Sequence, residues 1–142
     1  MGEAADVLVR ELTAVNERDI KTITASFSPE CIKLVPGARM QGGEQVAEWC
    51  SALFEAFPDF HITVTGVVEE APFATVSGVV TGTHRGTLRT PGGDIPPTGR
   101  SAEFTFSETA EVRDGVMVSV RLYFDRLELL EQLGVIPAPA NA

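Results

Sequence analysis

The sequence is short of basic residues: 11 Lys and Arg stand against 20 Asp and Glu, so the 142-residue chain has a formal net charge of −9. Surfaces that bind nucleic acids or anionic membranes need clustered Lys and Arg. No apolar run is long enough to cross a bilayer, and the acidic start MGEAADVLVREL is unlike a signal peptide. We therefore expect neither a nucleic-acid nor a membrane partner, and a cytoplasmic location.

Cysteine is also scarce, because the chain has only Cys31 and Cys50, far apart in sequence. They lack the neighbouring ligands of a zinc knuckle, and no other metal motif is visible. We expect both thiols to be reduced and buried, as is usual in a cytosolic protein. The sequence thus predicts a protein without a metal or another cofactor.

The first part of the chain carries apolar residues at helical spacing. One helix is predicted from about Glu3 to Asn16. Asp19 is a candidate N-cap for a second, short helix. A short strand, CIKLV, follows, and a third helix is predicted in GGEQVAEWCSALFEAF, which Pro58 ends.

Beyond Pro58 the apolar period changes to two, which is typical of strands. HITVTGVVEEAPFATVSGVVTGTH predicts two strands, and SAEFTFSETAEVRDGVMVSVRLYF predicts two more, joined by the hairpin pair Asp114–Gly115. The glycine- and proline-rich segment between these pairs, RGTLRTPGGDIPPTG, is predicted to be a long loop. The last helix, in DRLELLEQLG, is predicted to end at Gly134.

The order of these elements predicts a single α+β domain over residues 1–142. Helices come first, and a mainly antiparallel sheet follows them. The tail 137–142, with the sequence PAPANA, is expected to be flexible.

The predicted hairpin also determines which side chains share a face, because side chains alternate along each strand. A two-residue turn places Glu108 opposite Arg121 and Phe106 opposite Tyr123. The predicted core face then carries Phe104, Phe106, Glu108, Ala110, Val112, Met117, Arg121, Tyr123 and Asp125. An acid and a base facing each other in an apolar row satisfy the requirement that buried charges be paired.

The strand before the long loop adds a histidine to this face. His84 shares its strand parity with Gly78 and Gly82. We expect the two glycines to leave space among these polar side chains, which is the usual form of a small-molecule pocket.

Five motifs occur in order along the chain: AFPDF, GTHRG, IPPTGR, the DG hairpin, and D followed by LLEQLG. With these motifs the chain resembles the SnoaL-like polyketide cyclases, which share the superfold of nuclear transport factor 2, ketosteroid isomerase and scytalone dehydratase. The resemblance implies a cone-shaped α+β barrel, with N-terminal helices packed on a strongly curved sheet that encloses a pocket. It also implies a hydrophobic small-molecule substrate and cofactor-independent aldol cyclisation of a polyketide-like ester.

The resemblance further implies a homodimer, since members of the superfold commonly pair through the outer face of the sheet. The predicted outer face is rich in β-branched residues that suit such packing: Thr75, Val79, Thr81 and Thr105.

Asp125 has two interpretations. The sequence Asp-Arg-Leu-Glu resembles a capping box, in which Asp125 would cap the last helix. In the characterised cyclases an aspartate at the end of the last long strand abstracts an acidic C–H proton, and Asp125 matches it. The resemblance favours the catalytic interpretation.

The other predicted site residues surround Asp125 in this interpretation. His84 is a second catalytic candidate, although a lone inward histidine is more often structural. The predicted substrate-binding residues are Trp49, Phe106, Glu108, Arg121 and Tyr123. The pair Glu108–Arg121 is either structural or orients a substrate carbonyl, as in the acid–Arg–acid set of limonene epoxide hydrolase.

Arg121 also bears on the substrate, because many relatives have an aromatic residue at its position. The charge of Arg121 weighs against a polyaromatic substrate. Because this superfold hosts other functions, the alternatives are an epoxide hydrolase, a ketosteroid isomerase-like enzyme and a non-catalytic small-molecule-binding domain.

Overall fold

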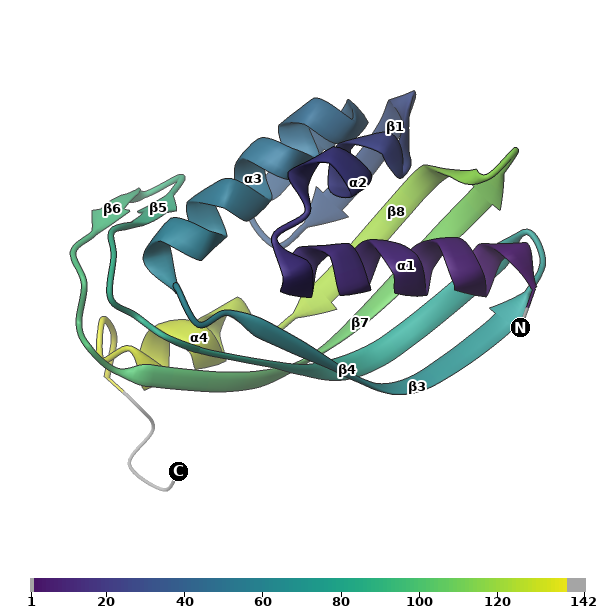
Figure 1. The fold of residues 1–142 in the computed structure, drawn as a ribbon. Helices are drawn as coiled ribbons and strands as arrows, with labels where there is room; N and C mark the ends of the chain where they lie inside the picture. The colour runs from purple at the N-terminus through teal and green to yellow at the C-terminus, as the bar shows by residue number, and fades with distance from the viewer. Residues whose placement is uncertain (1, 138–142) are drawn as a thin grey trace.

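The computed structural model describes residues 2–137 as helices packed on one face of a curved sheet (Figure 1). The helices are α1 (Glu3–Glu17), α2 (Ile20–Ala25), α3 (Gly42–Ala56) and α4 (Arg126–Gln132). The strands are β1 (Phe27–Val35), β2 (Ala38–Gln41), β3 (His61–Glu70), β4 (Phe73–Thr83), β5 (Leu88–Thr90), β6 (Gly93–Ile95), β7 (Ser101–Arg113) and β8 (Val116–Phe124). The predicted α+β class is confirmed. Apart from Pro137, the predicted tail lies outside the described residues.

The main sheet has six strands in the order β2-β1-β8-β7-β4-β3. All neighbouring strands are antiparallel except β1 and β8, which are parallel. Helices α1 and α3 cross the concave face, and α4 lies at one end of it (Figure 1). No helix in residues 2–137 is long and apolar enough to cross a membrane.

Three short strands were not predicted: β2, β5 and β6. Strand β2 folds back on β1, and the predicted long loop contains the hairpin β5–β6, in which Leu88 pairs with Ile95. Both side chains pack in a small cluster with Ala56 and Phe57 at the end of α3. Burial against α3 therefore stabilises a hairpin that the local sequence disfavours.

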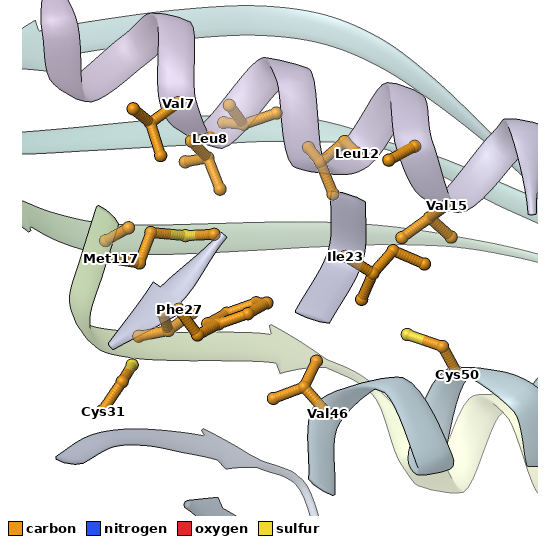
Figure 2. Packing of buried hydrophobic residues seen from close by; sticks show 14 of the residues in the cluster. Val7, Leu8, Leu12, Val15, Ile23, Phe27, Cys31, Val46, Cys50 and Met117 are labelled. Carbon is orange, nitrogen blue, oxygen red and sulfur yellow. The ribbon is translucent and has the colours of Figure 1, made fainter. Parts of the chain in front are cut away.

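The core lies between α1, α3 and the sheet (Figure 2). Buried side chains of α1, among them Leu8 and Leu12, meet Met117 of β8 and Val46 of α3. Both cysteines are free thiols in this interior, as predicted. Burial raises the pKa of Cys31 to about 11 and that of Cys50 to about 12, so neither is a ready nucleophile.

The hairpin between β7 and β8 is the predicted two-residue turn, but its register was predicted correctly only near the turn. Asp114 and Gly115 both have positive φ, and Val112 pairs with Met117. A β-bulge follows, because Glu111 pairs with Ser119 and leaves one extra residue, Val118, on β8.

The bulge reverses the predicted faces of β8 beyond Val118. A one-residue shift moves every later side chain to the other face of a strand. Val120, Leu122 and Phe124 therefore point toward the core, whereas Arg121 and Tyr123 point away from it. The predicted shared face of Glu108 with Arg121, Tyr123 and Asp125 is wrong for this reason.

The two inward glycines of β4 have different roles. A Cβ at Gly82 would lie 3.1 Å from the side chain of Phe57, and Gly82 lines the internal cavity. A Cβ at Gly78 would overlap the Thr63 carbonyl oxygen and the Phe106 ring. Gly78 thus permits close packing and does not leave the space that the sequence predicted.

We predict that Gly78→Ala destabilises the fold by about 1–3 kcal/mol, because the added methyl group overpacks a filled site. Gly66→Ala in β3 is the matched control, since nothing lies within 4 Å of its Cβ position. The control should change the free energy of unfolding by less than about 0.5 kcal/mol. Urea denaturation of both variants measures the difference, and equal effects would contradict the packing argument.

The homodimer remains a prediction, and we propose the outer sheet face as its interface. Tyr123 is 59% exposed on this face, beside Thr105 and Val79 of the neighbouring strands. Light scattering at micromolar concentration should give twice the mass of one chain. Tyr123→Arg should weaken the dimer, while Ile20→Arg on α2 should not. A monomeric wild-type protein would rule out the interface.

Candidate active site

A cavity of about 80 Å³ lies between α1, α3, α4 and the concave face of the sheet. Its walls are almost entirely apolar and rich in aromatic rings. They include Leu12, Val15, Trp49, Cys50, Leu53, Phe54, Phe57, Phe60, Ile62, Val80, Phe104, Phe106, Leu122, Phe124 and Leu129. Three charged side chains, Glu11, Lys33 and Glu108, also line the cavity. We call these three the buried triad.

Each member of the buried triad comes from a different element. Glu11 lies on the apolar stripe of α1, one turn from Val7, Leu8 and Val15. Lys33 shares the inner face of β1 with Cys31 and Val35, because side chains two residues apart point to the same side of a strand. Packing of α1 and β1 against β7 brings both residues to Glu108.

Lys33 and Glu108 form an ion pair within this interior. The Lys33 Nζ atom lies 3.5 Å from Oε2 of Glu108, and the two side chains are 4% and 2% exposed. The ammonium group also lies 5.4 Å from the centroid of the Trp49 ring and 5.7 Å from that of Phe27. These contacts hold a cation against aromatic faces, which attract it.

Glu11 is the titratable member of the triad at neutral pH. Burial raises the pKa of Glu11 from its ordinary value of 4.5 to about 7, the positive charge of Lys33 lowers it, and the charge of Glu108 raises it further. Burial alone would lower the pKa of Lys33, but the charges of Glu108 and Glu11 raise it above its ordinary value. Lys33 therefore remains charged while Glu11 exchanges a proton.

Three carboxyl oxygens of the triad have no hydrogen-bond partner among the described residues. They are both oxygens of Glu11 and Oε1 of Glu108. A carboxyl group with a pKa near 7 is populated in both its acid and its base form at neutral pH. The triad can therefore remove a proton from a molecule in the cavity, return it, and stabilise negative charge beside Lys33.

The structure brings three of the predicted site residues to the cavity: Trp49, Phe106 and Glu108. Glu108 is paired as expected for a buried charge, but its partner is Lys33. The predicted pair Glu108–Arg121 is wrong, because Arg121 pairs with Thr109 in the sheet register and is exposed on the outer face.

Asp125 and Tyr123 do not line the cavity. They border a shallow hollow on the outer sheet face with Thr105 and Ser107. Asp125 is exposed, and its Oδ1 atom accepts a hydrogen bond of 3.0 Å from the N–H of Glu128. This contact makes Asp125 the N-cap of α4. Its catalytic role stays a prediction from the resemblance.

His84 is fully buried but also lies outside the cavity lining. Its ring packs against Phe57, with 5.4 Å between centroids. Its Nδ1 atom accepts a 3.2 Å hydrogen bond from the N–H of Thr98 and lies 3.0 Å from the Thr98 hydroxyl. Burial lowers the pKa of His84. These contacts anchor the segment between β6 and β7, while the catalytic role of His84 remains untested.

Glu11 and Lys33 were not among the predicted site residues, although the sequence carries a detectable signal for both. Each is a charged residue at an apolar position of a periodic segment: Glu11 in the helical stripe and Lys33 in the strand alternation. A charge at such a position is rarely buried unless it is paired. An acid and a base that each break an apolar pattern are therefore candidates for a buried pair.

Among residues 2–137, no group of three or more His, Cys, Asp or Glu side chains is placed to hold a metal ion.

Comparison with known proteins supports an assignment for most of the chain. The family model described as "SnoaL-like polyketide cyclase" matches residues 6–133. No match was found among curated proteins.

Several solved structures share the fold. IdmH from Streptomyces antibioticus, a proposed polyketide cyclase, is 26% identical, with 94% of this chain and 99% of that chain covered and a TM-score of 0.78. AclR from Streptomyces galilaeus, a proposed hydroxylase, is 24% identical, with 98% and 86% covered and a TM-score of 0.80. An LEH-like epoxide hydrolase from M. tuberculosis is 18% identical, with 94% and 90% covered and a TM-score of 0.71.

The raised pKa of Glu11 predicts how stability depends on pH. The folded state binds this proton more tightly than the unfolded state, so the stabilisation is complete below about pH 4.5 and is lost as the pH rises through about 7. Relative to Glu11→Gln, the wild-type protein should lose about 3 kcal/mol of unfolding free energy over this range.

Urea denaturation of both proteins at a series of pH values measures this loss. Comparison with Glu11→Gln removes the contribution of other titrating groups, because the variant retains them. A difference that does not change with pH would show that Glu11 titrates normally.

Proposed function

The chain belongs to the SnoaL-like polyketide cyclase family, and from this premise we propose that it is a cofactor-independent acid–base enzyme acting on a small carbonyl compound. The proposed reaction is intramolecular aldol cyclisation of a polyketide-like substrate. One observation carries the proposal: the Glu11 carboxyl group, with a pKa of about 7, lines an apolar cavity beside the ammonium group of Lys33.

The triad offers a role for each side chain in this reaction. The Glu11 carboxylate removes a proton from a carbon next to a carbonyl group, and the Lys33 ammonium stabilises the resulting enolate oxygen. The enolate carbon then forms a bond to a second carbonyl carbon of the same molecule. Glu11 returns its proton to the new alkoxide oxygen, so the product is an isomer of the substrate.

Glu108 is a positioning residue in this scheme. Its carboxylate holds Lys33 at 3.5 Å and balances the ammonium charge inside the apolar walls. Because Lys33 remains protonated, the amine is not available as a nucleophile and acts through its charge. The reaction therefore needs no covalent intermediate with the protein.

A second candidate is epoxide hydrolysis, which the arrangement of two acids around one cation favours. Glu108 would then remove a proton from water, while Glu11 in its acid form would protonate the epoxide oxygen. The expected product is a diol, and assay of a small cyclic epoxide separates this reaction from aldol closure.

Substitution of Glu11 tests the proposed function. Glu11→Gln keeps the size of the side chain but cannot accept the substrate proton, so turnover should fall by about 10²–10⁴-fold. The assay follows ring closure of short acyclic diketones that form one six-membered ring. Circular dichroism should show that the variant remains folded.

Asp125→Asn is the matched control, because it removes the carboxylate that the family resemblance assigns as the base. Asn is itself a good N-cap, so α4 should persist with a loss of stability below about 1 kcal/mol. We expect turnover close to the wild-type rate. Loss of turnover in Asp125→Asn and its retention in Glu11→Gln would instead make Asp125 the base and the buried triad structural.

A further inference from the structure

We propose that the cavity selects neutral, single-ring compounds that donate hydrogen bonds, and that it rejects anions and fused multi-ring molecules. The inference concerns the ligands of the buried triad, and so it rests on the proposed function. It follows from three properties of the cavity: its size, its unpartnered oxygens and its charge.

The size of the cavity limits the ligand to about one ring. A dry engineered cavity of about 150 Å³ in another protein takes benzene, whereas the volume here is about 80 Å³. The half-buried rings of Phe54 and Phe60 line the cavity and pack edge to face, with 6.2 Å between their ring centroids. A single ring is therefore the upper limit for a ligand of this cavity. A fused system of three rings would require the packed wall between α3 and the sheet to separate.

The lining offers buried hydrogen-bond acceptors that have no partner among the described residues. They are both oxygens of Glu11 and Oε1 of Glu108. Buried acceptors without partners are costly. A ligand with hydroxyl groups satisfies them, whereas an apolar ligand of the same size does not.

The charge of the triad disfavours anions. Lys33 contributes one positive charge, Glu108 balances it, and Glu11 adds negative charge as the pH approaches and passes 7. An anionic ligand would place a further negative charge in an apolar space whose one cation among the lining residues is already paired. Attraction to Lys33 does not compensate for this, because the Glu108 carboxylate already pairs with the ammonium and the charge of Glu11 acts on it as well.

Matched monocyclic probes test the selection. Resorcinol is a benzene ring with two hydroxyl donors, and m-xylene has methyl groups of similar size in their place. Benzoate carries one negatively charged carboxylate group on the same ring. Calorimetry measures the affinities. The chain has one tryptophan, Trp49, which lines the cavity, so its single indole N–H signal in an NMR spectrum shows whether a probe enters.

Resorcinol should shift the Trp49 signal and bind at least about tenfold more tightly than benzoate. Glu11→Met removes the acceptors while filling a position in the apolar stripe of α1. This variant should weaken resorcinol about tenfold and leave the affinity of m-xylene unchanged. Glu44→Gln is the control and should alter neither affinity, because the exposed Glu44 carboxylate on α3 lies outside the cavity.

Three results would overturn the inference. They are binding of benzoate as tight as that of resorcinol, an equal effect of Glu11→Met on resorcinol and m-xylene, and entry of a dihydroxylated anthraquinone in preference to resorcinol. Because these experiments measure binding, they are independent of turnover. A Glu11→Gln variant with full turnover would contradict the proposed function and leave the binding preferences unaffected.

Discussion

Burial of the Lys33 ammonium group determines which charged side chains the interior must contain. An unpaired ion at this position would cost several kcal/mol, so the surrounding elements must supply negative charge. Glu108 of β7 pairs with Lys33 directly, and Glu11 of α1 adds a second carboxyl group. One cation cannot fully stabilise two carboxylates among apolar walls. Glu11 therefore keeps a pKa of about 7, and the ion pair that links β1 to β7 also leaves an exchangeable proton in the cavity.

The β-bulge at Val118 decides which side chains share this interior with the triad. Without the extra residue, Arg121, Tyr123 and Asp125 would face the cavity, and Leu122 and Phe124 would be exposed. A second cation beside Lys33 would disturb the balance of charge around Glu108. With the bulge, β8 gives the cavity apolar walls and places its polar side chains on the outer face. The bulge thus keeps the charged side chain of Arg121 on the outer face, away from the buried triad.

Asp125 does not line the cavity, but it caps helix α4, and a side chain of that helix does. Asp125 caps the first turn of α4, and Gln132 at its other end binds both the N–H and the carbonyl oxygen of Glu103 on β7. Leu129, between these two attachments, lines the cavity. An aspartate at the strand–helix junction therefore helps to close the site even though its own carboxylate lies outside it.

Local patterns in the sequence were sufficient for most of the fold: the helical stripe of α1, the cap at Asp19 and the Asp114–Gly115 turn each depend on neighbouring residues. They also predicted that Trp49, Phe106 and Glu108 face inward. Tertiary structure alone decided the partner of Glu108 and the face of Asp125. A bulge has no strong local signature, and Glu11, Lys33 and Glu108 are separated by many residues of chain. Their meeting depends on how helix and strands pack, because the charge of each is tolerated only in the presence of the others.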